Sequence, residues 1–247
     1  MFLELDLYTV FIMLLGISVG GFLKGVISFG FPLIALPILS LALPPKSSIF
    51  LLFFSLIFVN IREIKFSNWR SYKPITPLAC GIFIGIIFGS IIFHNVESKL
   101  ISKMIGITIV VSAIINFYGI KINKTLLSNK IFSLIYGFLA GIIGGMTTIV
   151  GPLIVIYLVS LNLKKEIFSE LVSLSVFSTL APLYGIFFMY QAVTFNDFFV
   201  SALLVIPAIL TQFLGFKIRE VIPQSFFKNI VLIILVIIGI LVLYKNW

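Results

Sequence analysis

Charged residues are scarce in this chain of 247 residues. They make up 10% of the sequence, whereas a soluble domain carries about 25%. Hydrophobic residues make up 61%, and the mean hydropathy is +1.26. So few charges exclude an ordinary soluble domain and indicate that lipid is the solvent. Because a spanning helix takes roughly 20 apolar residues, the length allows at most about a dozen crossings and leaves no room for an extramembrane domain.

Cysteine and histidine are rarer still, with one of each, Cys80 and His94. A single cysteine excludes a disulfide framework, and the two residues lie too far apart in sequence to suggest a Cys/His metal cluster or a catalytic pair. The sequence also lacks a phosphate-binding loop. We therefore expect no enzymatic activity, no metal and no cofactor. An intramembrane enzyme would need converging titratable groups that this sequence barely contains.

The net charge of +9 comes from 17 Lys and Arg against 8 Asp and Glu. The basic residues are spread through short connections and form no dense block, which disfavours nucleic acid as a partner and is typical of a membrane-topology signal. Acidic residues, Glu4 and Asp6, precede the first apolar run where a signal peptide would be basic. We expect that run to be retained as a membrane helix.

Uncharged apolar stretches recur along the chain. They cover residues 7 to 23, 25 to 45, 47 to 61, 74 to 96, 104 to 120, 131 to 163, 171 to 196, 198 to 216 and 229 to 244. The stretch 131 to 163 is too long for one ordinary pass and has glycines and a proline at its centre, so it should break into two shorter helices. Residues 7 to 43 are interrupted in the same way. The pattern predicts an all-α, polytopic integral membrane protein with about eight to ten membrane segments.

The two interrupted stretches also resemble each other. Four short matches occur in the same order: Gly21-Phe22-Leu23-x-Gly25-x-Ile27 with Gly137-Phe138-Leu139-x-Gly141-x-Ile143, Pro37 with Pro152, Ile49-Phe50 with Ile167-Phe168, and Gly89-x-x-Ile92 with Gly215-x-x-Ile218. This order favours a duplication of roughly 120 residues. We predict a first membrane repeat at 1–120, a polar linker at 121–130 and a second repeat at 131–247.

The distribution of basic residues predicts the orientation of the repeats. Connections rich in Lys and Arg are expected in the cytoplasm, and counting each broken stretch as two short helices places most of them there. Each half then has five segments. Because this number is odd, the second half is inserted upside down, and the halves are inverted repeats. Re-entrant hairpins would preserve the same parity. The linker should be cytoplasmic, and the turn from Gln191 to Asp197 should lie outside.

Interrupted segments at corresponding positions of two halves are a sequence indicator of a transporter's binding site. A broken helix frees backbone N–H groups, and a helix N-terminus carries partial positive charge, so two such ends facing each other would bind an anion. We therefore predict that both breaks contribute to a binding site for a small anion. Its candidate residues are Lys24, Gly25, Ser28, Gly30, Gly141, Gly144, Gly145, Thr147, Thr148 and Gly151.

Lys24 is the most informative of these residues, because a charge within a membrane segment costs about 2.5 to 3.5 kcal/mol on insertion scales. It is either a counter-ion for the substrate, or a residue near a helix end that reaches the headgroups or pairs with backbone carbonyls. The hydroxyl groups of Ser28, Thr147 and Thr148 are candidate hydrogen-bond donors to the oxygen atoms of the anion. The alternative is a hydrogen bond to a carbonyl of their own helix.

Several other polar residues have structural interpretations. Thr211 and Gln212 are expected to join neighbouring helices, with a place along the transport path as the alternative. His94 is expected at the membrane interface rather than in proton transfer. Glu166 and Glu170 are expected to form a charged turn at the level of the headgroups. A proton relay through Glu170 is the alternative.

The interrupted segments, taken together, resemble those of the TauE/SafE family of membrane transporters, which includes sulfite exporters. The resemblance rests on residues 21–30 with Pro37, on Leu43-Pro44-Pro45-Lys46 and on the segment from Gly137 to Pro152. It covers essentially the whole chain, although Lys24 stands where a small or apolar residue is more usual in the family. The resemblance implies secondary transport, across the cell membrane, of a small anion such as sulfite, an organosulfonate or a related carboxylate.

A protein of another class is the alternative: an accessory or scaffold membrane subunit that transports nothing. Its glycines would serve helix–helix contact and should lie four apart along one helix face, whereas the glycines here gather at two breaks with a charge among them. The expected partners are a small anion and the lipid bilayer, and the question of a homo-oligomer stays open.

Overall fold

The computed structural model describes residues 6–65, 72, 75–119, 122–161, 163–190 and 195–221, and all regular elements within these ranges are helices. They are α1 (Leu7–Ile27), α2 (Phe31–Leu39), α3 (Pro45–Leu51), α4 (Phe53–Ile61), α6 (Thr76–His94), α7 (Ser98–Tyr118), α8 (Lys124–Ser128), α9 (Lys130–Thr147), α10 (Gly151–Val159), α11 (Lys165–Met189), α12 (Phe195–Leu203) and α13 (Val205–Val221). The expected all-α class is confirmed. The apolar stretch 229 to 244 and most of the turn expected before Asp197 lie outside the described residues.

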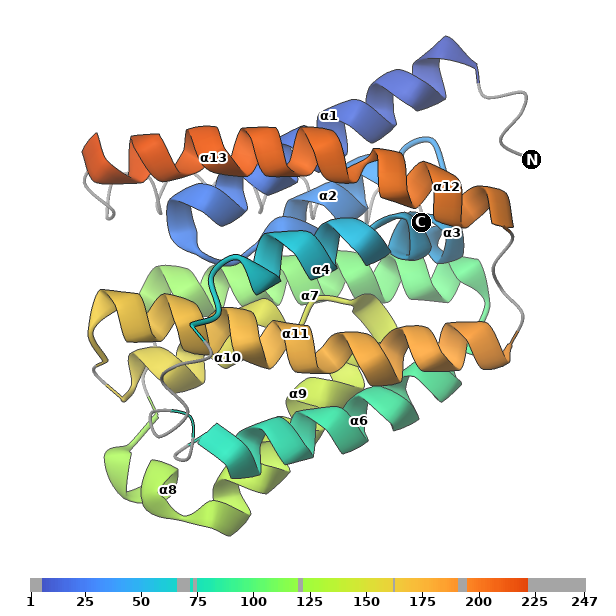
Figure 1. Ribbon diagram of the computed structural model, residues 1–247. Helices are drawn as coiled ribbons and strands as arrows, with labels where there is room; N and C mark the ends of the chain where they lie inside the picture. The colour runs from blue at the N-terminus through green and yellow to red at the C-terminus, as the bar shows by residue number, and fades with distance from the viewer. Residues whose placement is uncertain are drawn as a thin grey trace.

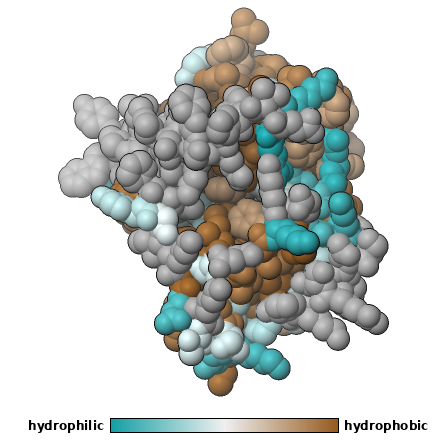
Figure 2. All heavy atoms as spheres, turned by 90° about the vertical axis from the view of Figure 1, so that its left-hand side faces the viewer, coloured by the Kyte–Doolittle hydropathy of each residue, from teal (hydrophilic) through white to brown (hydrophobic). Residues whose placement is uncertain are grey.

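Five stretches of described helix are long and apolar enough to cross a membrane. They are Leu7–Ile27, Thr76–His94, Lys130–Thr147, Ile167–Met189 and Phe195–Arg219. Large apolar side chains on them point outward, among them Phe11, Phe88 and Leu210, which are 60%, 53% and 62% exposed. Figure 2, which faces the left-hand end of the bundle in Figure 1, shows brown apolar residues at the top and centre and teal polar residues along the right and bottom. The chain is therefore a multi-pass membrane protein, while the higher segment count and the inverted repeats stay predictions.

Both predicted helix breaks are present, and they share one backbone geometry. α1 ends at Ile27 and α9 at Thr147, and the next residue in each case, Ser28 or Thr148, has a left-handed backbone with φ of 69° or 63°. The backbone N–H of that residue donates to the carbonyl four residues earlier, at 2.9 Å in the first break and 2.6 Å in the second. The chain then turns into a helix of nine residues, α2 or α10.

The proline that corresponds to Pro152 is not the one expected. Pro152 is the second residue of α10, and its counterpart in α2 is Pro32, whereas Pro37 lies inside that helix. Proline suits the first turn of a helix because the N–H that it lacks would have no partner within the helix. The breaks therefore correspond in the register that pairs Ser28 with Thr148 and Pro32 with Pro152.

Glycines at helix crossings hold two pairs of long helices together. α1 lies against α13 at one edge of the bundle, and α6 lies against α9 at the opposite edge (Figure 1). A Cβ atom on Gly25 would lie 2.2 Å from the carbonyl oxygen of Gln212. A Cβ atom on Gly85 would lie 2.1 Å from the carbonyl oxygen of Phe138. Without side chains at these positions the two backbones come into contact, as they do at small residues in other pairs of membrane helices. The first pair joins the two ends of the described chain, and the second joins α6 to α9 across α7 and α8.

Helices α4, α7, α10 and α11 lie between these two pairs (Figure 1). The long helix α11 packs against α4, α6 and α10, and its Tyr184 is buried with its hydroxyl group donating to the carbonyl of Ile49 at 3.0 Å. A side-chain cap begins each of the two helices that lead into a break: Asp6 accepts from the N–H of Thr9 at 3.1 Å, and Asn129 accepts from that of Ile131 at 2.9 Å. Such caps satisfy backbone donors that the first turn leaves unpaired.

Candidate functional site

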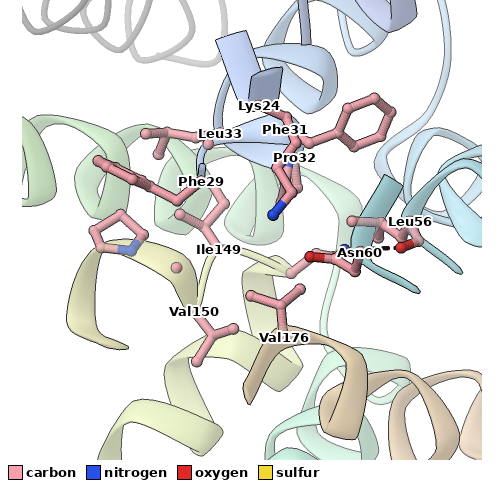
Figure 3. Close-up of a pocket in the computed structure, with 14 residues that line it drawn as sticks. Lys24, Phe29, Phe31, Pro32, Leu33, Leu56, Asn60, Ile149, Val150 and Val176 are labelled. Atoms are coloured by element: carbon pink, nitrogen blue, oxygen red, sulfur yellow. Dashed lines mark hydrogen bonds between the residues drawn. The ribbon is translucent and has the colours of Figure 1, made fainter. Parts of the chain in front are cut away.

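The two breaks meet at one cavity (Figure 3). The first break contributes Lys24 and residues 29–33, and the second contributes residues 148–152, while Leu56 and Asn60 of α4 and Val176 of α11 complete the wall. The cavity volume is about 20 Å³, which is about the space that one water molecule needs. The described conformation is therefore closed around its centre.

Helices α2 and α10 both begin at this cavity. Neither N-cap residue, Gly30 or Val150, makes a side-chain capping bond. The first N–H groups of a helix have no partner within it, and the helix dipole places about half a positive charge at that end. Gly30 also has a φ of 93°, a left-handed conformation in which a side chain would be strained. Two positive helix ends thus approach one small space.

Lys24 lies in the last turn of α1 and is 2% exposed. Its amino group donates to the carbonyl of Ser28 at 2.7 Å, to the Glu63 carboxylate at 3.0 Å and to the Ser173 hydroxyl at 2.7 Å. Lys24 is one of the residues that line the cavity (Figure 3). The Lys24 side chain is thus buried among protein groups, and pairing with a backbone carbonyl accounts for only one of its three contacts.

Glu63, in the turn after α4, is the carboxylate partner of Lys24. Its Oε2 atom accepts from Lys24, from the Ser169 hydroxyl at 3.2 Å and from the Ser173 hydroxyl. Ser173 thus accepts from Lys24 and donates to Glu63. The second oxygen, Oε1, is buried and has no hydrogen-bond partner among the described residues. A buried pair of opposite charges is neutral overall, which is how a membrane interior tolerates both.

The hydroxyl groups at the breaks divide into two kinds. Thr147 donates to the carbonyl of Ile143 at 2.8 Å, so the local interpretation holds for it. Ser28 Oγ and Thr148 Oγ1 are buried without a hydrogen-bond partner in the described part of the chain, and so is Asn60 Oδ1. An unsatisfied buried polar group costs about 1 to 3 kcal/mol. Thr148 and Asn60 line the cavity, so they are available to a ligand.

The predicted glycines also separate into two groups. Gly30 and Gly151 line the cavity. Gly25, Gly141 and Gly145 lie at the helix crossings, where an added Cβ would come within 2.2, 2.4 and 2.6 Å of a carbonyl oxygen of the facing helix.

Gly144 belongs to neither group, because its Cβ would lie 2.8 Å from that of Val150 in its own break. The structure therefore brings Lys24, Gly30, Thr148 and Gly151 together at the cavity. It gives the three crossing glycines a packing role.

A second polar cluster lies close to Glu63. Glu170 is buried, and its Oε1 atom accepts from the backbone N–H of Lys65 at 2.8 Å and from the Tyr72 hydroxyl. Burial, with Glu170 as a further cause, raises the pKa of Tyr72 above its ordinary value. Glu170 is thus enclosed by the protein and its position relative to the headgroups stays a prediction, while the side chain of Glu166 lies outside the description. The start of α11 binds the segment after α4 through Ser169, Glu170 and Ser173.

The other polar residues act within the bundle. Gln212 donates to the carbonyl of Val59 at 2.8 Å and so joins α13 to α4, as expected. Thr211 donates to the carbonyl of Pro207 in its own helix at 2.7 Å and lies at the crossing with Gly21 of α1, so its role in joining helices stays a prediction. The ring of His94 stacks on Tyr190 with 4.5 Å between centroids. Among the described residues, no three His, Cys, Asp or Glu side chains gather as a metal site would require.

Four residues of this site escaped the sequence analysis: Asn60, Glu63, Ser169 and Ser173. Glu63 lies between Arg62 and Lys65 in a charged connection, where a carboxylate usually faces solvent. A usable signal was present, since Asn60 and Glu63 lie three apart, and Ser169 and Ser173 four apart, at the ends of apolar helices. Such spacing places each pair on one helix face.

A comparison with protein families adds to this geometry. The family described as sulfite exporter TauE/SafE matches residues 12–242. The chain belongs to this family. TauE/SafE proteins are transporters rather than enzymes, so the resemblance seen in the sequence and the expected lack of enzymatic activity are both confirmed. Comparisons with curated proteins and with solved structures gave no match.

Proposed function

We propose that this TauE/SafE protein is a secondary transporter that carries a small anion, such as sulfite, an organosulfonate or a related carboxylate, across the cell membrane. One observation carries the proposal: the N-termini of α2 and α10 and the amino group of Lys24 converge on the same cavity. Broken membrane helices whose N-termini point at an anionic group are the usual binding element of secondary transporters.

The groups around the cavity suit an oxyanion. Backbone N–H groups at two helix ends can donate to different oxygen atoms of one ligand, and the helix dipoles favour negative charge. The hydroxyl of Thr148, which has no partner in the described part of the chain, adds a donor, and Lys24 supplies a full charge. A sulfite ion, a sulfonate or a carboxylate presents two or three oxygen atoms around a small centre, which matches donors that arrive from opposite sides.

Transport requires the walls of the cavity to separate, because about 20 Å³ does not hold such an ion. The glycine-packed pairs, α1 with α13 and α6 with α9, are close backbone contacts and would move as rigid units. We infer that the two breaks, one at the end of α1 and one at the end of α9, part alternately toward each side of the membrane. The matching geometry of the breaks supports the inverted-repeat arrangement that such a cycle uses.

The accessory-subunit alternative gains no support from the glycines. Gly81, Gly85 and Gly89 do lie four apart, as do Gly137, Gly141 and Gly145, but the two rows face each other within one chain. Their close contacts are thus used for internal packing. No glycine-rich surface for a partner helix follows from them.

Flux measurements in proteoliposomes test the proposal. Uptake and efflux of labelled sulfite, an organosulfonate and a carboxylate are compared for the wild type, Lys24→Ala and Lys217→Ala, the last changing an exposed lysine on α13. We expect selective flux of one anion class in the wild type and Lys217→Ala, and loss of at least about 90% of it in Lys24→Ala. No flux of any anion through well-folded wild-type protein would reject transport and favour the accessory subunit.

A further inference from the structure

The buried salt bridge beside the cavity connects the binding site to a titratable group. Lys24 and Glu63 are 3.0 Å apart, and their side chains are 2% and 7% exposed. Lys24 is part of the cavity wall, whereas Glu63 lies behind it and is held by α11 through Ser169 and Ser173. A ligand in the cavity would therefore meet Lys24 first and change the partner of Glu63.

The charge of the pair limits what the cavity can accept. While it is empty, Lys24 and Glu63 balance each other. A monoanion that binds to Lys24 adds one uncompensated negative charge at a place where charge separation is poorly screened. Proton uptake by Glu63 removes that excess. Extending the proposed function, on which this step rests, we propose that Glu63 takes up one proton with each monoanion and releases it when the anion leaves.

The contacts of the carboxyl group fit this role. Three donors surround Oε2, whereas Oε1 has no hydrogen-bond partner among the described residues. A proton on Oε1 would therefore displace no existing hydrogen bond. It would also weaken the attraction between Glu63 and Lys24, since a neutral carboxyl group no longer holds the ammonium group by charge. The Lys24 ammonium group is then free to bind the anion.

The neighbouring charges are consistent with this assignment. From α13, Arg219 acts on Lys24 as a like charge, so it adds to the positive charge that a bound anion would meet. From α11, Glu170 is already engaged by Lys65 and Tyr72. In the segment of Glu63 itself, the Arg62 guanidinium lies 5.8 Å from the ring centre of Phe216. None of these groups replaces Glu63 as the direct partner of Lys24.

Two neutral states follow from this arrangement. The empty protein contains the Lys24–Glu63 ion pair, and the loaded protein contains Lys24, the anion and a protonated Glu63. Both can reorient without moving a net charge through the membrane, and one proton crosses with one monoanion. A cavity that holds Lys24 opposite a permanently neutral group would be charged when empty, so its return without cargo would be slow.

The substitution Glu63→Gln tests this, because glutamine keeps the shape of a protonated glutamate. We expect the variant to exchange internal for external anion at a rate near that of the wild type. Its net uptake down an anion gradient should fall at least about tenfold, since the empty form no longer returns. A trapped pH dye should report proton movement with net anion flux in the wild type and none in the variant. Glu170→Gln is the matched control and should keep both.

Three outcomes would separate the claims. Wild-type flux that moves no proton, or net flux in Glu63→Gln that equals the wild type, would overturn proton coupling and leave anion transport standing. Absence of flux for every anion in the wild type would instead overturn the proposed function. If Glu63→Gln does not fold, wild-type flux at several imposed membrane potentials decides: independence from potential supports coupling of one proton to one monoanion, and a steep dependence contradicts it.

Discussion

The break between α1 and α2 and the break between α9 and α10 have the same backbone and different side chains. Both end a long helix with a left-handed residue, Ser28 or Thr148, and both start a nine-residue helix with proline in second place. Where the first break has Lys24, the second has Gly144, whose carbonyl makes the equivalent hydrogen bond. The backbone thus offers positive helix ends from two sides, while one break alone supplies a full charge.

Packing explains why the charge lies on one side. A Cβ at Gly144 would be 2.8 Å from the Cβ of Val150, so the second break has no room there for a lysine side chain. The first break has Gly30 in the place of Val150, and its lysine finds a carboxylate in Glu63. The shared backbone geometry thus determines where an anion would bind, and the Lys24–Glu63 ion pair determines the charge at that place.

The largest expected effect comes from removing the charge that distinguishes the breaks. Lys24→Met keeps most of the length of the side chain but leaves the buried Glu63 carboxyl group without its cationic partner, which should destabilise the protein by about 3 to 5 kcal/mol. The double variant Lys24→Met with Glu63→Gln should recover most of that loss. Thermal unfolding of purified protein in detergent measures both. A single variant as stable as the wild type would show that the pair is not buried together.

The next effect separates glycines at the crossings from those in the breaks. Gly145→Ala places a Cβ 2.6 Å from the carbonyl oxygen of Ile86, whereas Gly151→Ala meets no atom within 4 Å. The first should lower stability by about 1 to 3 kcal/mol and the second by less than about 0.5 kcal/mol. The fraction of monodisperse protein that survives heating reports the difference. Equal losses would contradict the division of the glycines.

The hydroxyl groups of Ser28 and Thr148, which have no hydrogen-bond partner among the described residues, give a smaller effect and test the symmetry of the breaks. Ser28→Ala and Thr148→Val each remove one hydrogen-bond donor, and each should weaken anion binding about tenfold, or roughly 1.4 kcal/mol. Half-saturation of flux, compared with Thr147→Val as the control, measures this, since Thr147 is already bonded to its own helix. A loss confined to one variant would mean that the anion contacts one break only.

The smallest effect concerns the backbone of the second break. Thr148 has a φ of 63°, which is costly for a β-branched residue. Thr148→Ser keeps the hydroxyl and matches the first break, and it should raise stability by up to about 1 kcal/mol. Unfolding temperature is again the measurement. A decrease would show that the packing of the threonine methyl group contributes more to stability than the left-handed backbone conformation costs.

Local features of the chain predicted the helices and the breaks well, because hydropathy and Gly or Pro positions act within a few residues. The role of each glycine was harder to predict. Gly25 and Gly30 look alike in sequence, yet one touches α13 and the other lines the cavity. A close helix crossing and a sharp turn both require the absence of a Cβ, so a glycine in the sequence does not distinguish them. The proline register, Pro32 rather than Pro37, was missed because apolar matches shift easily by a few positions.

The sequence by itself determined that the chain resides in lipid, that it is helical, and where two of its long segments break, since low charge and backbone constraints follow from composition and neighbouring residues. Only the tertiary structure decided which groups meet. Glu63 and Ser173 are remote from Lys24 along the chain, and they reach it because α4 and α11 pack beside the end of α1. A buried charge must find its partner in space, and that partner depends on how the helices pack.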